Sequence, residues 1–322
     1  MNERISPNLG LDLVRVTEAA ALTAVRWLGL GMPDQANQQA AYAMAEAFNT
    51  LNIDGRIVAG EEGKMGTHTN LDGGSRVGTG QGPTLDVVAD PIDGVILLSH
   101  GRPNAIAVAG VAPGGSMWAP TPAVYMEKII VDREAGEALV PECMDAPAAW
   151  TLALVARVKK KKVSDLIVFI LDRSRHEDLI DEIRTAGARV ILHGQGDISG
   201  ALMAANPDVN VDILMGVGGV SEGVISACAV KSLGGAMLGR LAPQSKQERA
   251  AVESAELDME QILTCSELVS GDDIYFAATG ITDSVLLKGI FYRGNLAETE
   301  SLVIRSKTGT RRLIHAEHLL RE

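Results

Sequence analysis

Two aspartates, Asp90 and Asp93, stand at the end of a short apolar segment and could bind a metal ion. Residues 85–89 are typical of a buried strand, and Pro91, which has no backbone N–H, predicts that this strand stops at residue 90. Gly94 would let the backbone of the following turn approach a ligand. Neighbouring carboxylates repel each other unless a cation lies between them, and their hard oxygen atoms suit Mg²⁺ or Mn²⁺. A turn that merely caps the strand is the alternative, and these residues alone favour it.

Other charged residues also stand where strands are expected to end. Glu61 follows the short strand expected at residues 57–59, and Arg173 and Arg175 follow the strand expected at residues 166–171. Arginines at the carboxyl end of a strand could hold a phosphate through bidentate hydrogen bonds. A surface turn for Glu61 and a solvated helix start for the arginines are the simpler interpretations of each segment alone.

The glycine-rich segment 215–223 resembles a dinucleotide-binding fingerprint but fits it poorly. After Gly216 and Gly218, the third glycine position holds Ser221, and no suitable acid follows about 20 residues later. The segment could still offer backbone N–H groups to a phosphate at a helix N-terminus. Glu222 would add a carboxylate there, or it would only be a favourable charge at the start of a helix.

Composition narrows the class of protein. The chain has 322 residues, of which 46% are hydrophobic, and a formal net charge of −12. The negative charge argues against broad nucleic-acid binding, which needs a basic surface. Its three cysteines form no CxxC pair, so neither a disulfide framework nor a zinc site is expected. No segment has the length and apolarity of a membrane span, so a cytoplasmic protein without a membrane partner is expected.

Hydrophobic periodicity predicts an α/β fold. One helix is expected at residues 11–28, with Leu11 and Leu28 on its apolar side, and a second from after Asp34 to about residue 48. Asp54 and Gly55 are expected to form a turn. From about residue 150, strands alternate with helices in the pattern of a doubly wound parallel sheet. We therefore expect two domains, an α+β domain at residues 1–150 and an α/β domain at residues 151–322. The short β segments near the C-terminus are expected to complete a sheet.

Two polar features have simple structural interpretations. The lysines of the run 159–162 are expected to be solvated at the end of a helix. Asp197, which follows Gln195 and Gly196, is expected to be the N-cap of the next helix.

Several of these segments, taken in order, resemble the class II (GlpX-type) fructose-1,6-bisphosphatases of the lithium-sensitive phosphatase superfamily. The similarity covers nearly the whole chain. It rests on these motifs: Asn52-Ile53-Asp54-Gly55 with Gly60-Glu61, Asp90-Pro91-Ile92-Asp93-Gly94, Val124-Tyr125-Met126-Glu127-Lys128, Arg173-Ser174-Arg175-His176, and residues 216–227, 278–282 and 301–312. Their order and spacing together are specific.

The resemblance implies a layered, inositol-phosphatase-like fold, with a mixed sheet in the N-terminal part and a doubly wound parallel sheet in the C-terminal part. It implies a homo-oligomer, dimer or tetramer, and a metal site in the first domain and sugar-phosphate binding in the second. The implied reaction is hydrolysis of fructose 1,6-bisphosphate to fructose 6-phosphate in gluconeogenesis or Calvin-type metabolism, with Mg²⁺ or Mn²⁺. The implied residues are Glu61, Asp90 and Asp93 for catalysis; these three with Glu222 and Asn37 for the metal; and Tyr125, Arg173, Arg175, Gln195, Asp197 and Gly219 for the substrate.

Several positions depart from the family pattern and leave other functions open; among them, Pro33 replaces a lysine, and the acidic loop around Glu61 is shorter. Val95 stands where the family has a threonine, Asn37 where it has a metal-facing aspartate, and Gln195 begins the segment that is Asp-Gly-Asp in the family. A divergent homologue that binds sugar phosphates with little or no turnover is one alternative. A phosphatase for another sugar bisphosphate is a second, whereas a dehydrogenase is disfavoured by the incomplete glycine fingerprint.

Overall fold

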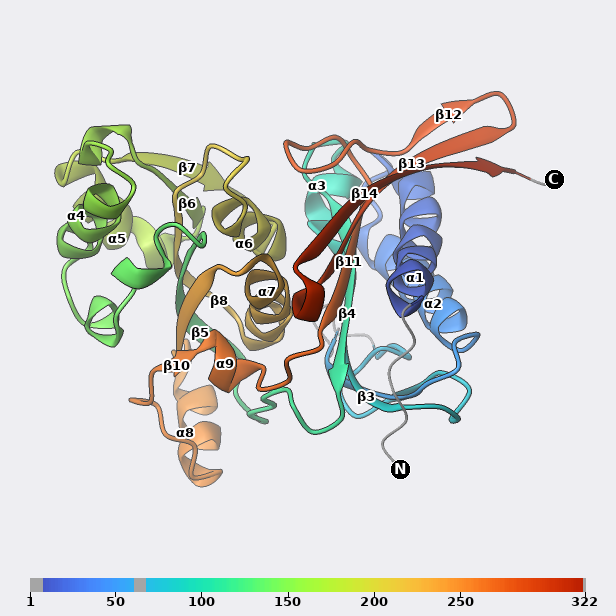
Figure 1. The fold of residues 1–322 in the computed structure, drawn as a ribbon, viewed down its shortest axis with the longest axis horizontal. Helices are drawn as coiled ribbons and strands as arrows, with labels where there is room; N and C mark the ends of the chain where they lie inside the picture. Colours follow the sequence, from blue (N-terminus) through green and yellow to red (C-terminus); the bar gives the residue numbers. More distant parts are fainter. Residues whose placement is uncertain (1–7, 61–67, 321–322) are drawn as a thin grey trace. The chain divides into compact units, whose positions relative to one another are not determined.

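The computed structural model describes residues 8–60 and 68–320. The chain forms two compact units, one made of Met1–Met117 and Gly271–Glu322 and the other of Trp118–Ser270 (Figure 1). These limits differ from the domain boundary expected near residue 150. The difference arises because the strand at residues 125–131, expected in the first domain, pairs only within the second unit. The C-terminal strands return to the sheet of the first unit, as expected.

The first unit contains a mixed sheet. Its strands have the order β12-β13-β11-β4-β3-β1-β2, and β14 pairs with β13. Only the pairing of β1 with β3 is parallel among the described strands of this sheet. The strands are β1 (Asp54–Ala59), β2 (Arg76–Val77), β3 (Thr84–Asp93), β4 (Ile106–Pro113), β11 (Tyr275–Gly280), β12 (Phe291–Arg293), β13 (Leu296–Arg305) and β14 (Thr310–Leu319).

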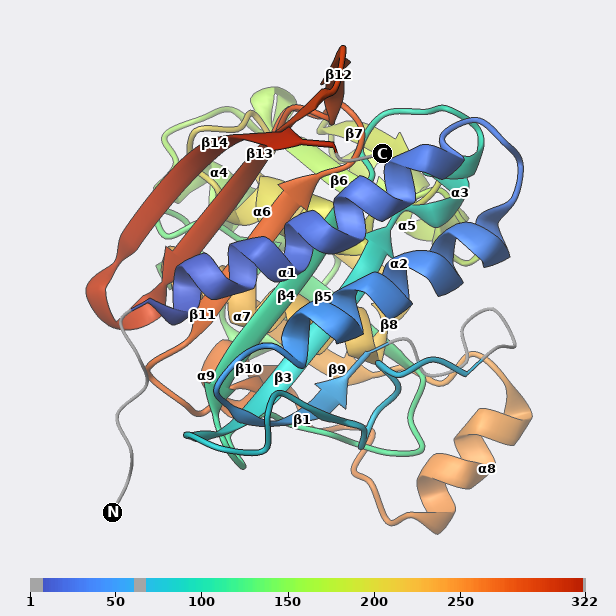
Figure 2. The ribbon, with the colours of Figure 1, turned by 90° about the vertical axis from the view of Figure 1, so that its right-hand side faces the viewer.

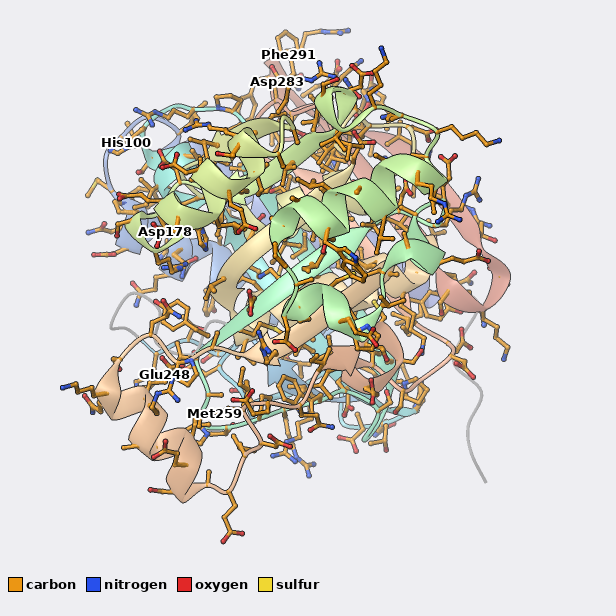
Figure 3. The ribbon with its side chains drawn as sticks, turned by 90° about the vertical axis from the view of Figure 1, so that its left-hand side faces the viewer. His100, Asp178, Glu248, Met259, Asp283 and Phe291 are labelled. Carbon is orange, nitrogen blue, oxygen red and sulfur yellow. The ribbon has the colours of Figure 1, made fainter. Side chains whose placement is uncertain are left out.

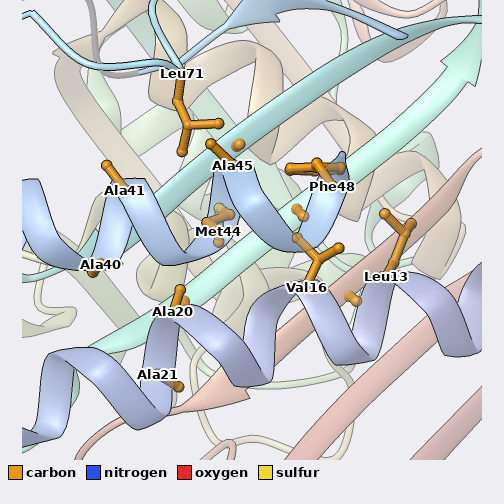
Figure 4. Close-up of a cluster of buried hydrophobic side chains, with 14 of the residues drawn as sticks. Leu13, Val16, Ala20, Ala21, Ala40, Ala41, Met44, Ala45, Phe48 and Leu71 are labelled. Carbon is orange, nitrogen blue, oxygen red and sulfur yellow. The ribbon is translucent and has the colours of Figure 1, made fainter. Parts of the chain in front are cut away.

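Two helices, α1 (Leu9–Ala24) and α2 (Pro33–Phe48), run across one face of this sheet (Figure 2). Many of their contact residues are alanines, which let the two helices pack closely around Phe48 and Met44 (Figure 4). The helix expected at residues 11–28 ends its α-helical part at Ala24 and continues as a 3₁₀ turn, Val25–Trp27. Leu11 and Leu28, expected on its buried side, are exposed.

Strand β3 does not stop at Asp90, as the proline had suggested. It continues to Asp93, and its register against β4 shifts between Asp90 and Asp93. Pro91 is tolerated because the irregularity removes the need for a ladder N–H at that position. Asp54 and Gly55, expected in a turn, are the first residues of β1. The short helix α3 (Val95–Ser99) follows Gly94, whose φ of +97° lies in the left-handed region.

The second unit has a six-stranded sheet of the order β10-β9-β5-β8-β6-β7. Its strands are β5 (Tyr125–Val131), β6 (Ile167–Leu171), β7 (Arg189–His193), β8 (Ile213–Gly219), β9 (Ala236–Leu241) and β10 (Leu263–Thr264). Strands β7, β6 and β8 are parallel, whereas β5, β9 and β10 pair antiparallel. The prediction of a parallel sheet is therefore correct for three strands only, and this sheet is also mixed.

Helices cover both faces of the second sheet (Figure 1). One face packs against α4 (Ala148–Val158) and α5 (Glu177–Thr185), and the other against α6 (Asp197–Ala205) and α7 (Val220–Leu233). Two further helices, α8 (Lys246–Ser254) and α9 (Cys265–Leu268), follow β9 and β10. Among the helices that the structure describes, none is long and apolar enough to cross a membrane.

The lysine run after α4 is only partly solvated. The Lys159 side chain is 8% exposed, and its Nζ atom lies 2.8 Å from carboxylate oxygens of both Asp132 and Asp212. Lys161 pairs with the same Asp212 oxygen at 2.6 Å. The expectation of a solvated run was wrong for Lys159 because the acids that bury it lie far away in the sequence.

Candidate active site

The expected metal residues of the first unit lie on β3 and α2. Asp90 and Asp93 are buried in the last part of β3, and Asp90 Oδ1 accepts a 3.0 Å hydrogen bond from the Ile92 N–H. This hydrogen bond is local, and it does not cap the strand as the simpler interpretation had foreseen, because β3 continues to Asp93. Asn37 is buried on α2, a helix that packs against β3 and α3. Glu61 lies outside the described residues.

Two buried carboxylates fit the donor chemistry of a hard divalent cation. Burying ionised carboxylates is costly unless a cation or hydrogen bonds compensate them. The described residues contain no group of three or more histidine, cysteine, aspartate or glutamate side chains placed to hold a metal ion. The metal role of Asp90, Asp93 and Asn37 therefore stays a prediction. Val95, which lies directly after Gly94, is buried at the start of α3.

In the second unit, the structure brings together Tyr125, Arg175 and Gly219. Tyr125 begins β5 and pairs with Gly219 at the end of β8. The Arg175 guanidinium carbon lies 5.2 Å from the centre of the Tyr125 ring, a cation–π contact. Arg175 Nε and Nη2 also donate hydrogen bonds of 3.3 and 2.9 Å to the Val217 carbonyl oxygen. The guanidinium is thereby fixed between two strand ends.

The backbone at Tyr125 is held by a carboxylate from α8. Glu248 Oε1 accepts 2.9 Å hydrogen bonds from the N–H groups of Val124 and Tyr125. Glu248 lies on the helix that Figure 3 shows at the edge of the second unit. A neutral side chain at this position would hold the two N–H groups less strongly, since charge-assisted hydrogen bonds are the stronger ones.

His176 ties the end of β6 to β8. Its Nε2 atom accepts a 2.9 Å hydrogen bond from the Val217 N–H, so the proton of the neutral ring is on Nδ1, which donates to the Leu171 carbonyl at 2.7 Å. Burial lowers the pKa of His176 and keeps the ring neutral. The loop that carries Arg173 and Arg175 is thus attached to β8 at both His176 and Arg175.

The other expected phosphate and sugar ligands lie close to these strand ends in the sequence. Arg173 is half-buried two residues after the end of β6, and its Nη1 atom donates a 2.9 Å hydrogen bond to the Asp172 carbonyl. Gln195 is half-buried in the turn between β7 and α6. Because β6 and β7 are parallel neighbours, both turns leave the same edge of the sheet.

Asp197 has a partner that the sequence did not suggest. It is the first residue of α6, and Gly196, with a φ of +94°, occupies the N-cap position expected for Asp197. The Asp197 carboxylate forms a buried ion pair with Lys128 of β5. A Cβ atom added at Gly218 would collide with both partners, so only glycine fits there without a shift. A lysine within the apolar strand at residues 126–131 was the signal that could have identified Lys128.

Glu222 lies in the first turn of α7, where the helix dipole favours a negative charge. Its carboxylate is so close to Gly219 that a side chain at residue 219 would overlap it. A side chain at residue 219 would therefore require the Glu222 carboxylate to move, and the role of Gly219 toward a substrate stays a prediction. The helix-charge and metal-ligand interpretations of Glu222 both remain predictions.

This end of the second sheet has the chemistry to bind a phosphorylated sugar. The turns after the parallel strands β6 and β8 carry two arginines and the N-terminus of α7, and all of these favour an anion. Tyr125 adds an aromatic ring and a hydroxyl group next to Arg175. A cationic, hydrogen-bonding surface of this kind suits a phosphate ester in a protein whose net charge is negative.

Comparisons with a family model and with known proteins point to the same family. Residues 7–318 match the family model described as bacterial fructose-1,6-bisphosphatase, glpX-encoded. The chain is 37% identical over 325 residues to the fructose-1,6-bisphosphatase class 2 of Haemophilus influenzae, covering 97% of this chain and 96% of that protein. It is also 37% identical to the fructose-1,6-bisphosphatase 1 class 2 of Escherichia coli K12, covering 97% of this chain and 95% of that protein.

Proposed function

Since the chain belongs to the bacterial, glpX-encoded fructose-1,6-bisphosphatase family, we propose that it is a phosphoric monoester hydrolase that converts fructose 1,6-bisphosphate to fructose 6-phosphate and phosphate. The observation that carries the proposal is the match along residues 7–318. The two mixed sheets with their covering helices also support an inositol-phosphatase-like arrangement of layers. We further propose that the protein works in the cytoplasm as a homo-oligomer.

The proposed metal is Mg²⁺ or Mn²⁺. Its proposed ligands are Glu61, Asp90, Asp93 and Glu222, with Asn37 at a fifth position. The position of Asp90 and Asp93 in the same stretch of β3 supports this choice, because carboxylate oxygens are the hard donors that these cations prefer. When bound, the cation would activate water and neutralise charge on the phosphoryl group.

The proposed substrate ligands are Tyr125, Arg173, Arg175, Gln195, Asp197 and Gly219. Arg175 would hold a phosphate oxygen in a fixed orientation, because Val217 and the Tyr125 ring already position its guanidinium. The ion pair with Lys128 would orient the Asp197 carboxylate, whose remaining acceptor capacity could serve a sugar hydroxyl.

A second candidate function is binding of a sugar phosphate with little turnover. It is favoured by Val95, a buried aliphatic residue without a hydrogen-bonding side-chain group, and by Asn37, which carries no charge. Loss of a positioning hydroxyl and of one ligand charge would slow hydrolysis more than it weakens binding.

Phosphate release separates these functions. The wild type and a Val95→Thr/Asn37→Asp variant would be assayed on fructose 1,6-bisphosphate and on a panel of other sugar bisphosphates, with Mg²⁺, with Mn²⁺ and with EDTA. Metal-dependent turnover by the wild type, fastest on fructose 1,6-bisphosphate, is the expected result. Turnover by the double variant alone would assign the natural protein a binding role. A different preferred substrate would replace the proposed one.

Arg175→Lys tests the substrate site separately from the metal. A lysine keeps the positive charge but loses the forked geometry, so KM should rise about tenfold while kcat changes less. An unchanged KM would remove Arg175 from the substrate site.

A further inference from the structure

Strand β14 forms an edge of the sheet in the first unit. Within residues 8–60 and 68–320 it pairs with β13 only, and Figure 2 shows it as the outermost strand. All ten of its residues are in one uninterrupted register with β13, and they include no proline. Proteins usually protect such an edge with a proline, a bulge, a covering element or charged side chains, and of these β14 carries charged side chains. Such an edge can accept another strand whose charges complement its own.

The hydrogen-bond pattern fixes which residues face outward. Leu320 N–H donates to the Asn295 carbonyl at 2.8 Å, in the same register as the pair Leu319 and Leu296. Directly opposed residues of an antiparallel pair alternate between bonded and non-bonded, so the even-numbered residues of β14 bond to β13. The odd-numbered residues 311–319 therefore direct their backbone N–H and C=O groups away from the sheet.

We propose that β14 binds β14 of a second copy of this chain, antiparallel and about a two-fold axis at Ile314. Only residues whose backbone groups point away from β13 can form hydrogen bonds with the second copy. Odd-numbered residues of one β14 must therefore pair with odd-numbered residues of the other. With the axis at Ile314, Arg311 lies opposite Glu317 and Leu313 opposite His315, twice each by symmetry. With the axis at His315, Leu313 would lie opposite Glu317 and Arg311 opposite Leu319. Of these two axes, charge complementarity favours the one at Ile314, which also pairs more of the strand than an axis beyond His315 would.

The side chains also fit a second copy. Ile314 is half-buried and packs against the edge of the first hydrophobic core. At the axis it would face its own symmetry mate in a non-bonded pair, the position where opposed side chains are closest. Leu313, exposed by 63%, would gain neighbours across the new pairing. The same strand thus provides both halves of a closed, two-fold contact.

A proline substitution tests the edge without harming the monomer. His315→Pro removes an outward N–H and no bond to β13, so the fold should survive while the dimer dissociates. Sedimentation velocity gives the assembly state, and circular dichroism with thermal unfolding confirms the fold. A wild type that is monomeric at about 10 µM, or a folded His315→Pro protein with unchanged assembly, would overturn the proposal.

Charge reversal tests the register. Arg311→Glu and Glu317→Arg alone should each raise the dimer dissociation constant about tenfold or more. The double variant Arg311→Glu/Glu317→Arg should restore it, because the pair is opposed again. If each single change weakens assembly and the double change weakens it further, these residues are not opposed and the axis is wrong.

Cysteine cross-linking locates the axis directly. Cα atoms of a non-bonded antiparallel pair lie about 4.5 Å apart, within the range of a disulfide. Ile314→Cys should therefore give a cross-linked dimer on oxidation, whereas the matched His315→Cys should not. The three native cysteines are buried and should give little background. Cross-linking by His315→Cys alone would contradict the axis at Ile314.

Discussion

Lys128 and Asp197 are oppositely charged partners inside the second unit, where their side chains are only 1% and 8% exposed. The pair links the middle of β5 to the first residue of α6, directly beside Gly218. Strand and helix ends that carry the expected substrate ligands are therefore joined by one buried contact.

Removing one member of this pair should be costly. Lys128→Met leaves the Asp197 carboxylate buried without its counter-ion, which should reduce the free energy of unfolding by about 3–5 kcal/mol. Asp197→Asn should have an effect of similar size, and the double variant should lose less than the sum of the two. Urea denaturation of all four proteins completes the cycle. Strict additivity would mean that the two charges do not interact.

Gly218 should tolerate no side chain. In Gly218→Ala the new methyl group would push into Lys128 and Asp197, with an expected loss of about 1–3 kcal/mol in unfolding free energy. Gly194→Ala is a matched control in the same unit, because no atom lies within 4 Å of the position where its Cβ would be placed. Equal stability of the two variants by thermal unfolding would argue against tight packing at residue 218.

His176 should make stability depend on pH. Burial lowers its pKa in the folded state, whereas an unfolded histidine has a pKa of about 6.5. Below that pH the unfolded chain binds more protons, so this contribution to stability decreases as the pH falls from about 6.5 toward the lowered pKa.

The matching variant is His176→Gln, which can still donate and accept a hydrogen bond but does not titrate in this range. Its unfolding free energy should fall less than that of the wild type between about pH 7 and about pH 5. His193, whose pKa burial also lowers, contributes to both proteins and cancels in the comparison. Parallel pH curves for the two proteins would exclude His176 as the source.

Lys159 should be the important member of its lysine run. Burial alone lowers the pKa of Lys159, but hydrogen bonds to Asp132 and Asp212 outweigh it and raise that pKa. Lys159→Met removes the cation that pairs with the buried Asp132 and leaves Asp212 with Lys161 alone, with an expected loss of about 3–5 kcal/mol in unfolding free energy. Lys162→Met, at an exposed site in the same run, should stay within about 0.5 kcal/mol of the wild type. Similar urea midpoints for both variants would contradict the structural role of Lys159.

Features that depend on residues close together in the sequence could be predicted from it. Helix α2 was predicted with its correct C-terminal end at Phe48 because the alanine-rich pattern continues to that residue, whereas its start was expected after Asp34 and lies at Pro33. The family resemblance was correct because it rests on short motifs in a fixed order, and the comparisons confirm it.

Features that depend on distant residues were missed. From its sequence neighbours, Asp197 resembles an N-cap; in the structure it pairs with Lys128, 69 positions away in the sequence. Lys159 looks solvated until Asp132 and Asp212 surround it. Pro91 looks like a strand end until the register shift against β4 accommodates it. No periodicity within a segment reports such contacts, so the pairing had to come from the structure.

The second unit interrupts the first, since the chain leaves the first unit after Met117 and returns to it at Gly271. In the first sheet, β11 lies between β4 and β13, so β4 cannot complete its pairing until the later strand β11 has been made. On the ribosome the inserted unit is therefore fully synthesised while the first still lacks β11 to β14. We therefore expect the second unit to fold before the first during synthesis. The N-terminal residues of the first unit are made earliest but make their final contacts last.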